Sequence, residues 1–134
     1  MEEALIKRVL PHSIEAEQSV VGAMLMDKEA IMTASEIISG EDFYQTTYGD
    51  VFGAIVELYN EGKPVDLITL QDRLREKDVP EEIQSLEFVR ELLTSVSTSA
   101  NVKYYADIVA EKSMLRKLIR LTEGIANTCY LAKE

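Results

Sequence analysis

The chain has 134 residues and a formal net charge of −10, which fits a single domain with an acidic surface. Because binding of DNA or RNA relies on lysine and arginine side chains that neutralise phosphates, this charge argues against direct nucleic-acid binding. The chain has a single cysteine, which excludes an internal disulfide bond. It contains no run of about 18 apolar residues that could span a membrane, and its acidic start is unlike a secretory signal. The expected location is therefore the cytoplasm.

The first predicted helix follows an amino-terminal arm. Residues 1–12 carry no clear helix signals and are expected to form a flexible arm. Ser13 is placed to cap the helix, with Glu15 and Glu17 in its first turn, where carboxylates suit the positive end of the helix dipole. His12, the one histidine of the chain, is expected to be a solvated residue.

Capping and breaking residues delimit the second and third helices. Asp27 is placed to cap the second helix, and Gly40 is expected to end it in the left-handed conformation. The third helix is expected at about residues 47–61, and Gly62 ends it. The aromatic side chains predicted to pack inside are Phe43, Tyr44, Tyr48, Tyr59, Tyr104 and Tyr105.

Two shorter helices complete the predicted globular part. Asp66 is placed to cap the fourth helix after a break at Pro64, and Ser85 to cap the fifth after a break at Pro80. These signals predict an all-α fold in which residues 13–98 form a small helical globular domain of about five to six helices.

A long helix is predicted from about residue 101 to 133, because this segment has no proline and only one glycine. One mostly apolar stripe along it consists of Tyr105, Ile108, Lys112, Leu115, Ile119, Thr122, Ala126 and Cys129. A second stripe, turned by roughly a right angle or more, consists of Met114, Leu118, Leu121 and Ile125. A helix of about 50 Å exceeds the width of a domain of about 100 residues, so it is expected to protrude and to need a partner.

No catalytic or cofactor site is predicted. Gly62 and Lys63 resemble part of a phosphate-binding loop, but that loop also needs a glycine at position 57 and a serine or threonine at position 64. Glu57 and Pro64 stand there instead. One cysteine and one histidine cannot supply the four ligands of a structural zinc site. The chain is therefore expected to bind no ATP and no metal, and to have no enzyme activity of its own.

Four blocks of the chain carry a family resemblance. They are PHSIEAEQ with VGA (11–18, 21–23), DFY with VFGAI (42–44, 51–55), GKPVD with TL and Leu74 (62–66, 69–70), and NV with YADIV and LRKLI (101–102, 105–109, 115–119). In this order they resemble the amino-terminal domain of the bacterial hexameric replicative DNA helicase, the DnaB family. The resemblance covers about residues 11 to 130. The segment Pro80–Glu82 departs from it, because many relatives have a longer, glycine-containing connection there.

The resemblance implies a fold and a role. The family domain is a small helical globule followed by a helical hairpin, and residues 99–134 would be the first helix of that subunit-pairing hairpin, truncated before the second. Hairpins pair between subunits, and three pairs form a ring collar in a hexamer. The implied partners are further copies of the chain, the helicase-binding domain of primase and, in some species, a helicase loader. ATP and magnesium belong to a separate motor domain of the parent helicase, which unwinds duplex DNA at the replication fork.

Two sets of residues are candidates for partner binding. The apolar pattern of the long helix selects Met114, Leu118, Leu121 and Ile125, with Ile119 nearby. For primase docking, the family pattern suggests Glu15, Phe88, Arg116, Ile119 and Ile125. Packing within the chain is the alternative for Ile119 and Phe88, and the helix dipole is the alternative for Glu15.

Two other classes of function stay open on the sequence. A free-standing helical adaptor or regulatory protein could use the same fold, and a Gly-x4-Gly-Lys-Thr segment further along the gene would decide for the helicase. A small DNA-binding helical domain is the third class, and the net charge of −10 opposes it.

Overall fold

The computed structural model describes residues 9–132, so most of the arm expected at residues 1–12, and the end of the long helix expected near residue 133, lie outside the described residues. Within the described range the chain is all-α, as predicted, with six α-helices, two short 3-10 helices and no strand. The elements are α2 (Ile14–Met26), α3 (Lys28–Ile37), η1 (Gly40–Asp42), α4 (Thr46–Asn60), α5 (Leu67–Glu76), η2 (Glu81–Gln84), α6 (Leu86–Thr94) and α7 (Val102–Leu131).

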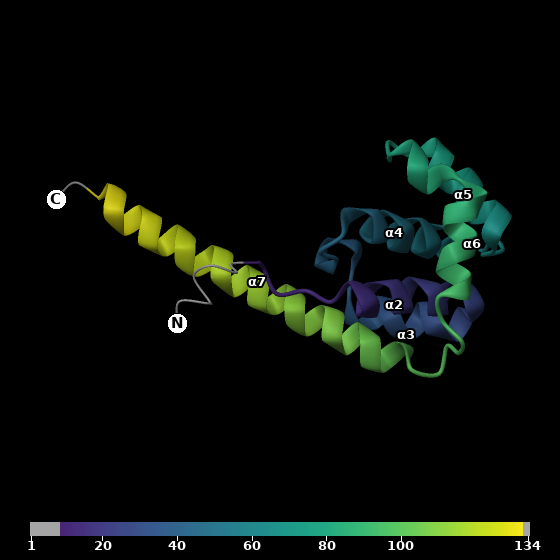
Figure 1. The fold of residues 1–134 in the computed structure, drawn as a ribbon, viewed down its shortest axis with the longest axis horizontal. Coiled ribbons are helices and arrows are strands. Elements are labelled where there is room, and N and C mark those ends of the chain that lie inside the picture. Colours follow the sequence, from purple (N-terminus) through teal and green to yellow (C-terminus); the bar gives the residue numbers. More distant parts are fainter. Residues whose placement is uncertain (1–8, 133–134) are drawn as a thin grey trace.

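The helices form a compact head from which α7 extends (Figure 1). Helices α2 and α3 lie side by side, and the first half of α7 packs along both of them. Helix α4 lies on the other side of α2, and α5 and α6 close the end of the head that is remote from the tip of α7. The second half of α7 leaves the head, and none of its residues after Ile119 is buried.

The predicted amino-terminal caps of four helices are confirmed. The Ser13 hydroxyl accepts from Ala16 N–H, and an Asp27 oxygen accepts from Glu29 N–H. The Asp66 carboxylate accepts from Ile68 and Thr69 N–H, and the Thr69 hydroxyl bonds Asp66 N–H, which completes a capping box. The Ser85 hydroxyl accepts from Phe88 N–H. Each side-chain cap satisfies an amide that has no partner within its helix, and its loss costs about 1 kcal/mol.

The prediction that Gly40 ends the second helix in a left-handed conformation is wrong. Helix α3 stops earlier, with Ile38 as an extended C-cap, and Gly40 opens η1. The glycine with positive φ among the described residues is Gly62 (φ 73°), at the predicted end of α4. Gly40 instead packs closely on Gly49 of α4: a Cβ atom added at Gly49 would lie 2.6 Å from the Gly40 carbonyl oxygen, and one added at Gly40 would lie 3.0 Å from the Gly49 carbonyl oxygen.

Glu17 stabilises a helix other than its own. Its side chain is buried, and its two carboxylate oxygens accept from Tyr44 N–H at 2.8 Å and Gln45 N–H at 3.0 Å. Gln45 is the N-cap of α4 and makes no side-chain capping bond. The carboxylate of α2 therefore satisfies amides at the start of α4 and couples the two helices.

The face of α7 that packs on the head differs from the predicted stripe. The buried residues are Val102, Ala106, Val109, Ser113 and Arg116, one position away from the predicted set. Tyr105 and Ile108 are half-buried at the edge of this face, and Leu115 is exposed. Small side chains allow α7 to approach α2 and α3 closely, so size complementarity decides the rotation of the helix.

The aromatic residues divide between core and surface. Phe43 is buried and its ring lies 5.3 Å from that of Phe52, as expected for a core residue. Tyr48, Tyr59 and Tyr105 are half-buried against the core. The prediction fails for Tyr44 and Tyr104, which are exposed.

None of the helices of the described part combines the length and the apolar character required to cross a membrane.

Candidate partner-docking site

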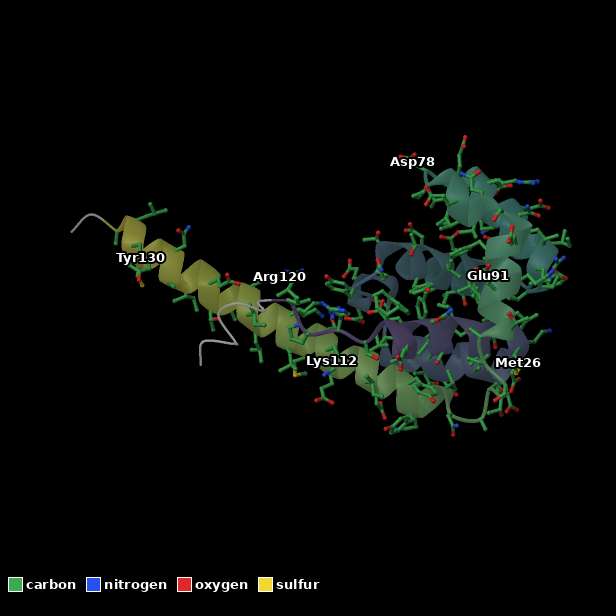
Figure 2. All side chains as sticks on the ribbon, viewed as in Figure 1. Met26, Asp78, Glu91, Lys112, Arg120 and Tyr130 are labelled. Carbon is green, nitrogen blue, oxygen red and sulfur yellow. The ribbon has the colours of Figure 1, made fainter. Side chains whose placement is uncertain are left out.

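The protruding half of α7 carries an exposed apolar face. Four residues at alternating spacings of four and three are exposed over half or more of their surface: Met114, Leu118, Leu121 and Ile125. They are the second stripe predicted from the sequence. Figure 2 shows the helix from Arg120 to Tyr130 standing free of the head. A contiguous exposed apolar face on a helix marks an interaction surface.

A shallow hollow lies along this face. It has a volume of about 420 Å³ and is lined by Arg120, Leu121, Gly124, Ile125, Thr128 and Cys129. A Cβ atom added at Gly124 would meet nothing within 4 Å, so the glycine lowers the helix surface between Leu121 and Ile125. Such a depression between apolar ridges can receive side chains of a second helix.

Arg116 joins three segments where α7 leaves the head. Its side chain is only 3% exposed, and its Nη1 donates to the Pro11 carbonyl oxygen at 2.8 Å. Its Nη2 donates to the Asp42 carbonyl oxygen at 2.7 Å, and its guanidinium lies 5.7 Å from the centroid of the Tyr44 ring. The arginine thus fastens the arm, at Pro11, and the end of η1, at Asp42, to α7.

His12 packs against the same junction. Its ring stacks on that of Tyr44 with the centroids 4.0 Å apart and the planes at 8°. Its Nδ1 lies 2.7 Å from the Leu10 carbonyl oxygen, and donates to it in the tautomer with a proton on Nδ1. The expectation of a solvated histidine is therefore wrong, because the exposed Tyr44 ring provides a flat apolar surface for the imidazole.

The Asp42 carboxylate accepts several hydrogen bonds beside this junction. Its carboxylate accepts from Ser39 N–H at 2.8 Å, the Ser113 hydroxyl at 2.7 Å and Lys117 Nζ at 3.3 Å. Burial by itself would raise the pKa of the Asp42 carboxyl, but these hydrogen bonds and the charge of Lys117 together lower it below its usual value. Asp42 is therefore held ionised as an acceptor for α7.

A second charged cluster joins α4 to α5, remote from the protruding helix. Arg73 makes a two-pronged pair with Glu61, at 2.9 and 2.7 Å, and also donates to Glu57 at 3.1 Å. Lys77 bonds the other oxygen of Glu57 at 2.6 Å. The bonds from Arg73 and Lys63 lower the pKa of Glu61 to about 2. The residues of this cluster bond one another, and no group of acidic, histidine or cysteine side chains in the described range is arranged to hold a metal.

The structure separates the predicted partner-binding residues into three groups. Met114, Leu118, Leu121 and Ile125 share the exposed face, and Ile119 is half-buried beside the arm. Arg116 is buried at the junction, and Glu15 is exposed in the first turn of α2. Phe88 is half-buried against the core on α6, at the other end of the head from the tip of α7. Sequence reasoning missed Val9, Leu10 and Tyr44 as neighbours of this site.

Comparison with known proteins agrees with this architecture. The family described as "DnaB-like helicase N terminal domain" matches residues 9–111. The chain is 43% identical over its full length to the replicative DNA helicase DnaB of Geobacillus stearothermophilus, and 39% identical to the replicative DNA helicase DnaC of Bacillus subtilis. In both cases it spans about 30% of the relative's length.

Two solved structures share the fold. The crystal structure of the N-terminal domain of DnaB helicase from Mycobacterium tuberculosis has a TM-score of 0.87 and 35% identity, covering 92% of this chain and 90% of that one. The N-terminal domain of DnaB helicase from Helicobacter pylori, described with its interactions with primase, has a TM-score of 0.73 and 20% identity, covering 87% of this chain and 90% of that one. At that identity the second likeness shows the fold alone. The family match over residues 9–111 and the shared all-α fold show that the chain belongs to the family of DnaB-like helicase N-terminal domains.

Proposed function

We propose that this chain is the assembly and docking domain of a replicative DNA helicase. In this proposal the parent protein unwinds duplex DNA at the replication fork in the cytoplasm, and ATP and magnesium bind in a separate motor domain. The chain supplies contacts and no chemistry. Its relationship to replicative helicases, of which it spans about 30%, supports this division of labour.

The observation that carries the proposal is the exposed apolar face of α7. Leu118, Leu121 and Ile125 are 50% to 61% exposed on a helix that continues well beyond the head. We assign this face to the pairing of two copies of the chain, with residues 99–134 as the first helix of a subunit-pairing hairpin that contributes to a hexameric ring. Burial of a large apolar side chain from each copy is worth about 1.5–3 kcal/mol.

The second proposed partner is the helicase-binding domain of primase. The Helicobacter pylori relative is described with its interactions with primase, and this chain has the same fold. Glu15 on α2 and Ile119 and Ile125 on α7 are the residues we propose for this contact, with Phe88 as a more distant candidate. A helicase loader is a further partner consistent with the family.

Replacement of Ile125 by aspartate tests the proposal. Ile125 is 56% exposed and outside the core, so Ile125→Asp leaves the melting temperature unchanged. Self-association in sedimentation equilibrium, or primase affinity in calorimetry, falls by at least about tenfold, equivalent to about 1.4 kcal/mol. The matched control is Met32→Asp, because Met32 is 50% exposed on α3.

The two variants also define the contrary outcome. Equal behaviour of Ile125→Asp and Met32→Asp in both assays would show that the face of α7 is not the interface. A lower melting temperature for Ile125→Asp alone would show that this residue packs within the chain.

A further inference from the structure

Arg116 holds the arm against α7, and the His12 ring stacks on Tyr44 beside it. Both terminal nitrogens of the Arg116 guanidinium donate to backbone carbonyls of this chain, one of them that of Pro11. With 3% of its surface exposed, Arg116 presents almost nothing for a partner to contact. Any effect of Arg116 on docking must therefore pass through the segments that it fastens.

The fastened arm brings two apolar residues to the side of α7. Val9 and Leu10, directly before Pro11, line one hollow with Ile119, Thr122 and Glu123, with a volume of about 510 Å³. Val9 is 65% exposed, and Leu10 is half-buried with its carbonyl bonded by His12. The arm thus forms one wall of this hollow, and α7 forms the other.

This arm-walled hollow does not lie on the face proposed for self-pairing. Ile119 and Thr122 each follow Leu118 and Leu121 by one residue, which turns them by about 100° around the helix axis. A partner seated in the hollow therefore leaves Leu118 and Leu121 of the pairing face uncovered. The hollow continues from Ile119, one of the residues proposed for the primase contact.

We propose that Arg116 is a positioning residue for primase docking. By holding the Pro11 carbonyl it places Val9 and Leu10 beside Ile119, and the arm-walled hollow so formed receives apolar side chains of the helicase-binding domain of primase. This inference rests on the proposed docking function and adds to it the arm and the mode of action of Arg116. Because only the guanidinium fork reaches two carbonyls at once, Arg116→Lys keeps the charge and loses the positioning.

The position of the arm is tested first, without any partner. The chain has no tryptophan, so Leu10→Trp provides a single fluorescent reporter in the hollow. Adding Arg116→Lys to the reporter chain shifts its emission to the red and increases quenching by acrylamide. Adding Arg120→Lys, the same substitution at an exposed arginine one turn along α7, leaves both unchanged. An identical spectrum for all three chains overturns the positioning role.

Docking is tested by binding of the purified helicase-binding domain of primase to the 134-residue chain. The affinity falls about fivefold or more in the double variant Val9→Ser/Leu10→Ser, and by a similar factor in Arg116→Lys. Combining all three substitutions lowers the affinity no further than either variant alone, because both act through the position of the arm. Self-association stays as in the unaltered chain, which a general loss of folding would not allow.

Three results overturn the inference. Additive losses would mean that Arg116 acts independently of the arm, and unchanged primase affinity would exclude the arm from the surface. A fall in self-association in place of primase affinity would assign the hollow to a second copy of the chain. If the unaltered chain shows no affinity for primase, the proposed primase contact fails first and the docking role of the arm falls with it, while the fluorescence result still decides whether Arg116 holds the arm.

Discussion

The two halves of α7 are one continuous helix with opposite surroundings. The first half buries Val102, Ala106 and Val109 among α2 and α3, whereas no residue of α7 after Ile119 is buried. Side chains are small where the helix meets its own chain and large where it meets solvent, as at Leu121 and Ile125. In α7, large apolar residues therefore mark the outward face and small ones mark the packed face.

Charge follows the same division. Carboxylates outnumber basic side chains in the head, while α7 has more basic side chains than carboxylates, with Lys117 and Arg120 near the point where it leaves the head. An acidic partner is therefore repelled less by α7 than by the head.

The largest contrast is expected between equal truncations in the two regions. Leu74→Ala removes a side chain that is fully buried in the head and lowers the free energy of unfolding by about 2–5 kcal/mol. Leu121→Ala, at a residue that is 61% exposed, changes it by no more than about 0.5 kcal/mol. Urea denaturation measures both, and a comparable loss for Leu121→Ala would place the tip of α7 within the cooperative fold.

A smaller contrast is expected between two carboxylates of α2. Glu17→Gln replaces the buried acceptor of two amides near the start of α4 with a side chain that has only one acceptor oxygen. The variant is expected to lose about 1–3 kcal/mol of stability, because one amide is left unsatisfied. Glu15→Gln, the matched change at an exposed site in the same turn, should have little effect on thermal unfolding; equal melting temperatures for the two variants would contradict the role of Glu17.

Loss of one helix cap is expected to lower the free energy of unfolding by less than the Glu17 substitution. Asp66→Ala removes the acceptor for Ile68 and Thr69 N–H and is expected to reduce stability by about 1 kcal/mol. Asp66→Asn keeps a side-chain oxygen and serves as the control, so it should recover most of the loss in the same denaturation experiment. An asparagine variant as unstable as the alanine variant would mean that charge, not capping, is what Asp66 contributes.

The smallest effect on stability is expected from protonation of Asp42, where α7 leaves the head. The folded-state pKa of Asp42 is depressed, so its contribution to stability is present above the unfolded pKa, near 3.8, and is lost as pH falls through the folded value. Asp42→Asn should therefore flatten the acid limb of the stability curve below about pH 4. Equal slopes for the variant and the unaltered chain in this range would show that Asp42 is not coupled to folding.

Local signals in the sequence predicted the local structure well. Ser13, Asp27, Asp66 and Ser85 act as caps because each bonds amides within three residues, so the information lies in a few neighbouring positions. The all-α class and the exposed stripe with Leu118 and Leu121 follow from composition and spacing in the same way. The family resemblance was confirmed on residues 9–111.

Contacts between distant segments were not predictable from the same signals. Ala106 and Ser113 do not stand out by hydrophobicity, and only the shape of α2 and α3 selects their face of α7. Arg116 bonds Pro11, at a separation of 105 residues, and Glu17 bonds Tyr44 and Gln45 across 27 and 28. Arg116 was selected from the family pattern as a docking residue, and no signal in the sequence indicated that its side chain would be buried.

The uninterrupted course of α7 has a mechanical consequence. Its first half is clamped to α2 and α3, and Arg116 is the last buried residue before the free end. From there about 15 residues continue for about 22 Å, so a tilt of the head by about 10° displaces the tip by about 4 Å. The helix therefore acts as a stiff lever, and any partner that grips its tip also sets the orientation of the head.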